Sequence, residues 1–118
     1  MRRLALLLGL ALLVGCATPT GSKPKEYLVS HILCADEHAA NQALNRILAG
    51  EPFELVAQDV SIDPGTQNKG GRIAHWTAAD SWSPKFASEV KRLKVGQMAD
   101  RPVSTEFGWH VVRADSAR

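Results

Sequence analysis

The chain begins with an apolar run that is set apart from everything after it. Residues 4–14 are almost wholly apolar and follow two arginines, Arg2 and Arg3. A membrane-spanning helix needs about 20 apolar residues, so this run is too short to be one. A basic start, a short apolar stretch and small residues at its end form the layout of a secretory signal peptide, which we assign to residues 1–15.

A polar segment separates this run from the next regular pattern. Residues 16–25 contain two prolines and a glycine, which is typical of a flexible tether. Residues 27–33 combine β-branched and aromatic side chains and predict a strand. We therefore expect one folded domain, residues 26–118, that opens with this strand.

Three helices are predicted within the domain. Asp36 suits the N-cap of a helix whose apolar residues recur every three or four positions. Residues 52–60 predict a second helix, with Pro52 in its first turn. We expect these two helices to pack side by side on one face of the sheet. Ser83 and Pro84 suit the start of a third, short helix.

The remaining strand candidates are shorter. Residues 72–76 and 98–104 are two of them, and Pro102 favours an edge position for the second because proline donates no ladder hydrogen bond. Residues 109–114 predict the last strand. The resulting order is β-α-α-β-α-β-β. Without regular βαβ alternation, this order predicts an α+β domain with a four-stranded, mostly antiparallel sheet and about three helices.

The end of the apolar run adds a chemical signal. Residues 13–16 read LVGC and resemble a bacterial lipobox, in which cleavage precedes the cysteine and its thiol receives a lipid. We expect Cys16 to be the lipid attachment site, with an ordinary signal peptide and an incidental cysteine as the alternative. Ala17 follows in place of an aspartate, and by analogy with Gram-negative lipoproteins this favours the periplasmic face of the outer membrane. Cys34 then remains as a lone thiol, expected to be buried.

Charge argues against one class of function. The formal net charge of +2 falls to zero when cleavage before Cys16 removes Arg2 and Arg3. No arginine-rich stripe is present in the remaining sequence. We therefore expect no nucleic-acid partner.

Three segments carry residues capable of chemistry. Residues 30–33 read SHIL, residues 61–65 read SIDPG with Gly70 and Gly71 after them, and residues 107–112 read FGWHVV. In this order they resemble the parvulin family (PpiC or rotamase type) of peptidyl-prolyl cis/trans isomerases. The resemblance extends over nearly the whole expected domain. It implies a parvulin-like fold and isomerisation of Xaa-Pro peptide bonds.

The resemblance also implies four catalytic residues. His31 and His110 match a histidine pair on adjacent central strands, Thr105 a threonine that sets one tautomer, and Asp63 a polar group near the substrate carbonyl. Two neighbouring imidazoles are costly to charge together, so we expect a neutral, hydrogen-bonded pair at pH 7. Each residue also has a purely structural interpretation, such as a turn aspartate before Pro-Gly for Asp63.

Substrate binding is expected to need an apolar seat for the proline ring. Phe86 and Phe107 match aromatic positions of the family, and Trp82 stands where a methionine is usual. Plain core packing is the alternative for each. The sequence departs from the family at residues 72–74, which read RIA in place of Asp-Leu-Gly, and in a connection over residues 76–82 that is one residue longer.

Rotation about a prolyl bond meets a barrier of roughly 18–20 kcal/mol but breaks no bond, so we expect neither cofactor nor metal. We expect a non-covalent isomerase that acts on unfolded or folding envelope proteins, including outer-membrane or periplasmic precursors. The alternative is a membrane-tethered chaperone or peptide-binding module with weak or no isomerase activity. A purely structural lipoprotein is a third possibility.

Overall fold

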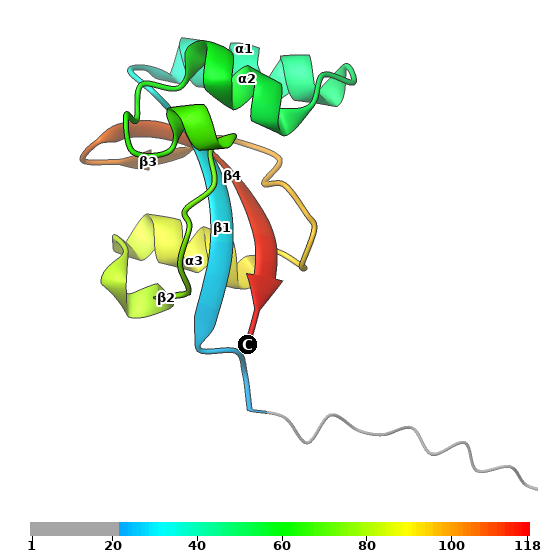
Figure 1. Ribbon diagram of the computed structural model, residues 1–118. Helices are drawn as coiled ribbons and strands as arrows, with labels where there is room; N and C mark the ends of the chain where they lie inside the picture. The colour runs from blue at the N-terminus through cyan, green and yellow to red at the C-terminus, as the bar shows by residue number, and fades with distance from the viewer. Residues whose placement is uncertain (1–21) are drawn as a thin grey trace, which may run out of the picture.

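Two long antiparallel strands form the centre of the structure (Figure 1). The computed structural model describes residues 22–118; the expected signal peptide, Cys16 and most of the expected tether lie outside them. Strand β1 spans Glu26–Cys34 and strand β4 spans Gly108–Ala117. Strands β2, Thr77–Ala78, and β3, Val103–Thr105, extend the sheet on either side, in the order β2-β1-β4-β3, and every pair is antiparallel.

Helices cover both faces of this sheet. Helices α1, Glu37–Leu48, and α2, Phe53–Val60, pack on one face, and α3, Pro84–Arg92, packs on the other (Figure 1). Two short 3₁₀ turns, η1 at Gln67–Lys69 and η2 at Ala79–Ser81, lie in the connections. The α+β class, the order of strands and helices and the pairing of α1 with α2 on one face are confirmed.

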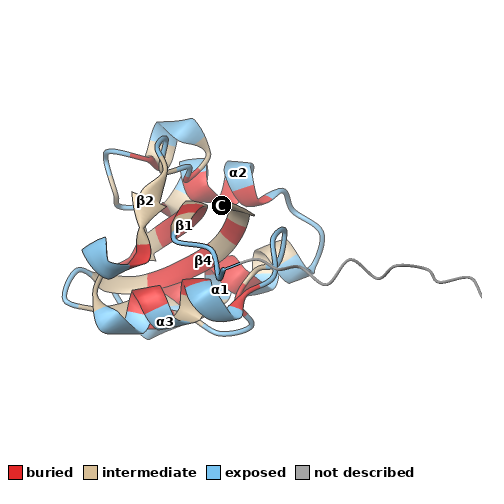
Figure 2. Ribbon diagram, turned by 90° about the horizontal axis from the view of Figure 1, so that it is seen from below, coloured by how far each residue is buried: buried red, intermediate tan, exposed pale blue. Residues whose placement is uncertain are grey.

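The alternation of side chains along the central strands divides the core into two. Val29 and Val112 face α3, whereas Ile32 and Val111 face α1 and α2. Figure 2 shows buried residues along β1 and β4, with exposed residues on the outer surfaces of the helices. His31 immediately precedes Ile32 and therefore points to the α3 face.

One sequence prediction placed a strand wrongly. Residues 72–76 do not form a strand: Arg72 makes a single bridge with Ser30, and the N–H of Ile73 donates to Val29 at 2.9 Å. The chain then leaves β1 and rejoins its beginning only at β2. The sequence of residues 72–76 indicates an extended segment, but it does not show over how many residues that segment pairs with β1.

The candidate strand at residues 98–104 is shorter than expected. Met98 makes an isolated bridge with Arg113, and regular pairing resumes only at β3, after Pro102. Proline has no N–H to donate, which accounts for the interruption. Within residues 22–118, no helix is long and apolar enough to cross a membrane.

Candidate active site

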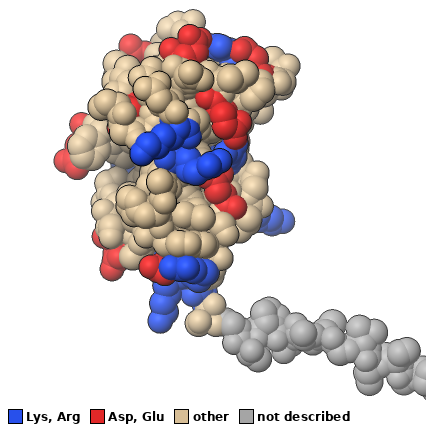
Figure 3. All heavy atoms as spheres, viewed as in Figure 1, with Lys and Arg blue, Asp and Glu red and all other residues tan. Residues whose placement is uncertain are grey.

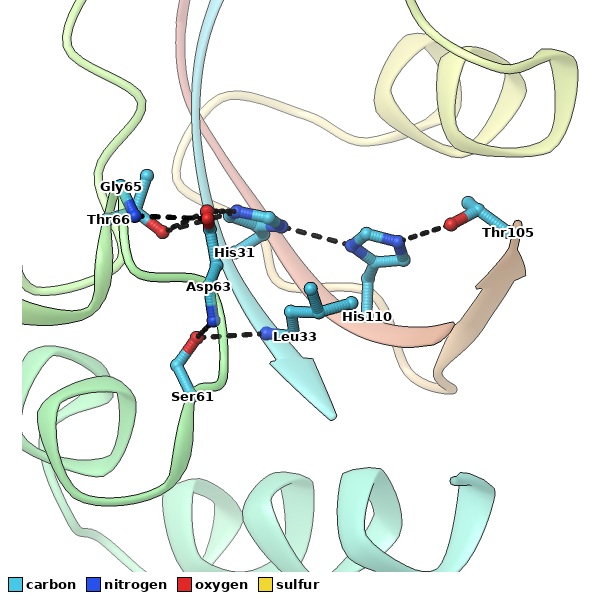
Figure 4. Close-up of polar contacts among 8 residues, drawn as sticks. All are labelled: His31, Leu33, Ser61, Asp63, Gly65, Thr66, Thr105 and His110. Carbon is cyan, nitrogen blue, oxygen red and sulfur yellow. Dashed lines mark hydrogen bonds and ion pairs between the residues drawn. The ribbon is translucent and has the colours of Figure 1, made fainter. Parts of the chain in front are cut away.

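Two histidines meet on the α3 face of the central strands (Figure 4). His31 lies opposite Val112 in the β1–β4 register, so His110, two residues earlier on β4, is its diagonal neighbour on the same face. The Nδ1 atoms of the two histidines are 3.0 Å apart, and their rings stack with centroids 5.2 Å apart. Both side chains are buried, and both line the two cavities described below.

Each histidine has a further partner at its outer nitrogen. His31 Nε2 lies 2.8 Å from Oδ2 of Asp63, and His110 Nε2 lies 2.6 Å from Oγ1 of Thr105. The four side chains form one line, with the histidines in the middle (Figure 4). We refer to this arrangement as the histidine line.

The capacity of each group to donate or accept gives the histidine line a direction. Ionised Asp63 only accepts, so His31 donates to it from Nε2–H. A neutral His31 must then accept at Nδ1, from the Nδ1–H of His110. His110 in turn accepts at Nε2 from the Thr105 hydroxyl, whose oxygen accepts the N–H of Phe107. All four hydrogen bonds point toward Asp63.

Burial keeps His110 neutral, and hydrogen bonds keep Asp63 ionised. Desolvation, reinforced by the neighbouring His31, lowers the pKa of His110 to about 4, and the opposing effect of Asp63 is smaller. Burial raises the pKa of the Asp63 carboxyl. Hydrogen bonds from Thr66, His31 and the backbone N–H of Gly65 outweigh it, so that the pKa lies below its ordinary value. At neutral pH the histidine line therefore contains an uncharged His110 and ends in the negative charge of Asp63.

The loop that carries Asp63 is held against β1 by hydrogen bonds at both of its ends. Ser61 Oγ accepts the N–H groups of Leu33 and Asp63, at 3.2 and 3.3 Å. At the far end of the loop, the carbonyl of Gly71 accepts the N–H of His31 at 2.8 Å. Gly71 has φ +82°, and a Cβ there would lie 2.5 Å from the His31 carbonyl oxygen, so this approach requires glycine.

Two adjoining cavities open above the histidine pair. A cavity of about 310 Å³ is lined by Trp82, Phe86 and Phe107, and a cavity of about 470 Å³ contains Asp63. Four residues line both: His31, Ile73, Phe107 and His110. The larger cavity is the polar one, and it also holds Lys69 and Arg72. We call the two spaces the apolar pocket and the polar cavity.

Phe86 joins the apolar pocket to the histidines. It is 4 % exposed, and its ring meets that of His110 nearly edge-on, with centroids 5.2 Å apart. The Trp82 ring lies 5.2 Å from that of Phe86. Phe107 is 70 % exposed and forms a rim rather than a wall.

All seven site residues expected within the domain line these two cavities or the histidine line, whereas Cys16 lies outside the described residues. Thr66 was missed. Its hydroxyl donates to Asp63 Oδ2 at 2.6 Å and lies 3.3 Å from His31 Nε2. A threonine three residues after the aspartate of an Asp-Pro-Gly turn was the available signal.

Within residues 22–118, no group of three or more His, Cys, Asp or Glu side chains is placed to hold a metal ion.

This fold, with a histidine pair on its two central strands and a carboxylate and a threonine at the ends of that pair, defines a parvulin-type domain. A family model described as a PPIC-type peptidyl-prolyl isomerase, or rotamase, domain matches residues 31–116. The chain belongs to this family.

Known proteins agree with this assignment. The chain is 42 % identical over 94 residues to a probable parvulin-type peptidyl-prolyl cis-trans isomerase of Bordetella pertussis, covering 79 % of this chain and 36 % of the relative. It is similar to the crystal structure of the peptidylprolyl isomerase PrsA from Bacillus cereus, with a TM-score of 0.76, 30 % identity and coverage of 81 % and 36 %. A structure reported for SurA-like chaperones of Campylobacter jejuni, one of them described as periplasmic, gives a TM-score of 0.74, 32 % identity and coverage of 81 % and 40 %. The chain thus spans about a third of the length of the curated relative.

Proposed function

We propose that this chain catalyses cis/trans isomerisation of Xaa-Pro peptide bonds without a covalent intermediate. The observation that carries the proposal is the position of the histidine line, which runs beneath the junction of an apolar pocket and a polar cavity. A prolyl peptide has the same two-part character. Its ring is apolar, and the amide that rotates beside it is polar.

The apolar pocket is the seat of the proline ring. Buried Phe86 and partly buried Trp82 supply aromatic surface, and Phe107 covers the ring from the exposed side. A ring held there places its nitrogen, and the carbonyl attached to that nitrogen, above the histidine pair. Rotation then moves the carbonyl while the ring stays fixed.

Asp63 favours the twisted amide over the planar one. In the planar amide, conjugation places negative charge on the carbonyl oxygen; twisting returns the electron pair to nitrogen and reduces that charge. A carboxylate facing the oxygen therefore repels the planar ground state more than the twisted state, which lowers the barrier. Since no bond is broken, Asp63 needs no proton to transfer.

His31 and His110 act as positioning residues in this mechanism. His31 holds Asp63 ionised and aimed at the polar cavity through a hydrogen bond of 2.8 Å. His110 holds His31 in the tautomer that donates, and Thr105 does the same for His110. The line thus fixes one charged group in a partly dry site, where fixed charges act most strongly.

The test is exchange spectroscopy on a short Ala-Pro peptide, with and without the purified chain. We expect accelerated cis/trans exchange that disappears in a double variant, His31→Ala with His110→Ala. Equal exchange in the presence and absence of the chain, with the fold intact by circular dichroism, would overturn the proposal.

We further propose that the domain works in the bacterial envelope, as a lipoprotein. In this proposal residues 1–15 are the signal peptide, Cys16 carries the lipid, residues 16–25 are the tether and residues 26–118 the isomerase domain. The periplasmic description of one similar chaperone supports the location. A tether of nine residues after the cysteine reaches about 30 Å, so clients would be proline-containing precursors that pass close to the outer membrane.

Labelling with a radioactive fatty acid in bacteria tests the anchor. We expect label on the wild-type chain and none on Cys16→Ser, together with a shift of that variant from the membrane to the soluble fraction. If the wild-type chain incorporates no fatty-acid label, the lipid anchor is contradicted, whereas the isomerase proposal is unaffected.

A chaperone or peptide-binding module is the second candidate. The exposure of Phe107, at 70 %, favours it, because a large exposed aromatic side chain at a pocket rim suits unfolded segments. The similarity to SurA-like chaperones points the same way. Suppressed aggregation of an unfolded protein without any acceleration of prolyl exchange would favour this second function.

A further inference from the structure

We propose that Lys69 and Arg72 form a subsite for an anionic side chain on the residue that precedes proline, so that the domain prefers Glu-Pro and Asp-Pro bonds. This inference rests on the proposed isomerase function. It concerns the polar cavity, whose occupant the mechanism above leaves open.

The first observation is an unpaired cation. Six arginines lie within residues 22–118, and five of them have a carboxylate oxygen within 4.0 Å. Arg72 alone has none in this part of the chain, and Lys69 also lacks one there. Both side chains are exposed, and both line the polar cavity of about 470 Å³. Cations at a cavity wall that have no carboxylate partner within the protein can pair with an anionic ligand.

The acidic groups that face these cations are already occupied. Glu54 is near enough to Arg72 for that charge to contribute to its lowered pKa, but its carboxylate pairs with Arg113 at 3.0 Å. Asp63, the one acid in the lining of the cavity, accepts hydrogen bonds from Thr66, His31 and Gly65. The ionised groups that line the cavity therefore sum to one positive charge, from two cations and one carboxylate.

Basic side chains also gather on the molecular surface in this region. Figure 3 shows Lys and Arg side chains gathered near the middle of the face seen in Figure 1, where the loop after η1 crosses the sheet. Acidic side chains lie beside this group in the same view. The loop is fixed in place by the contact of Gly71 with β1, so Arg72 starts from a rigid backbone position.

The position of Asp63 decides which substrate residue meets these cations. The carbonyl that rotates belongs to the residue before proline. If Asp63 faces that carbonyl, the preceding residue lies on the Asp63 side of the histidine pair, which is the polar cavity. Its side chain then reaches the wall that carries Lys69 and Arg72, while the proline ring occupies the apolar pocket.

The experiment compares kcat/KM for peptides that differ only in Glu-Pro against Gln-Pro. Two exposed ion pairs predict a ratio of about 3 to 10 in favour of Glu at low ionic strength, falling toward 1 in about 1 M salt. The double variant Lys69→Gln with Arg72→Gln is expected to bring the ratio to about 1. The charge reversal Lys69→Glu with Arg72→Glu is expected to favour Lys-Pro over Gln-Pro.

Arg101→Gln is the matched control. Arg101 is 82 % exposed and lies at a different cavity, so its replacement lowers the net charge by one, half the change made by the double variant, without touching the subsite. We expect this variant to retain the Glu/Gln ratio. Activity on Ala-Pro with a Glu/Gln ratio near 1 in the wild type would overturn the subsite alone, whereas absence of activity on every peptide would overturn the proposed function.

Discussion

The two faces of the central strands each bury polar groups, but in opposite ways. Ser30 and His31 are neighbours on β1 and point to opposite faces. On the α2 face, Ser30 donates to Asp115 at 2.6 Å, and Arg113 pairs with Asp115 at 2.7 Å and stacks over the Phe53 ring. The charged groups of this cluster therefore pair with one another.

The α3 face carries the histidine line instead. Its His110 is neutral, its hydrogen bonds run in one direction when His31 is neutral too, and the charge of Asp63 faces a cavity. We interpret the first set of polar groups as stabilising the fold, and we propose that the second set acts on the substrate. The first set pairs opposite charges with one another, whereas the second places one carboxylate, held by hydrogen bonds from neutral donors and from His31, at a cavity wall.

Two phenylalanines allow the sharpest comparison of the faces. Phe53 and Phe86 are each 4 % exposed, one on each face. Truncation of either to alanine is expected to lower the free energy of unfolding by about 3–5 kcal/mol, measured by urea denaturation. The milder leucine variants separate the roles. Phe86→Leu is expected to lose most prolyl isomerase activity and Phe53→Leu to retain it. Equal losses in the two leucine variants would break the distinction.

Acid should lower the free energy of unfolding through His110, which lies on the α3 face. An unfolded histidine has a pKa near 6.5, and burial lowers that of His110 to about 4 in the fold. Between these values the unfolded chain binds a proton that the folded chain does not. This contribution to stability is full above pH 6.5 and falls by about 1.4 kcal/mol per pH unit between pH 6.5 and 4. Urea titrations at several pH values measure it, and His110→Gln should show a shallower slope in that window. An unchanged slope would mean that His110 is not held neutral by burial.

Two aspartates of similar burial test where charge matters for catalysis. The side chains of Asp63 and Asp115 are 26 % and 22 % exposed, and each accepts several hydrogen bonds. We expect Asp63→Ala to lower kcat/KM for an Ala-Pro peptide by about 10²-fold, in the range seen when one fixed electrostatic group is removed. Asp115→Ala should cost stability and leave kcat/KM within a few-fold. Similar activity of the two variants would contradict the role given to Asp63.

The smallest effect concerns the start of the histidine line. Thr105→Val keeps the shape of the side chain but removes the hydroxyl that donates to His110 Nε2. Leaving a buried acceptor unsatisfied costs about 1–3 kcal/mol, and we expect a loss of about tenfold in kcat because His110 then loses its tautomer preference. Thr105→Ser should restore most of the rate. A serine variant as impaired as the valine variant would show that packing, not the hydroxyl, matters at this position.

Much of this architecture was predictable because it rests on local rules. The Asp36 cap forms as expected, with its carboxylate accepting the N–H of Ala39 at 2.8 Å, and helical spacing located α1 and α2. The meeting of His31 and His110 followed from the resemblance to a family and not from their separation in the sequence. No local pattern indicates that residues 79 positions apart lie 3.0 Å from one another.

What the sequence did not predict depends on the path of the backbone. The strand expected at residues 72–76 shrinks to one bridge because the chain turns away from β1 after Ile73. Thr66 was missed because its role depends on a turn that folds it back onto Asp63. The sequence does not show which arginines form ion pairs. In the structure five of the six arginines of residues 22–118 pair with carboxylates and Arg72 does not.

The direction of the histidine line is the central claim, and nitrogen-15 NMR of the imidazole rings tests it most directly. At pH 7 we expect both rings to be neutral, with the proton on Nδ1 of His110 and on Nε2 of His31. Two-bond couplings from the ring protons distinguish these tautomers in the folded chain. A proton on Nε2 of His110, or an imidazolium at either position, would contradict the account.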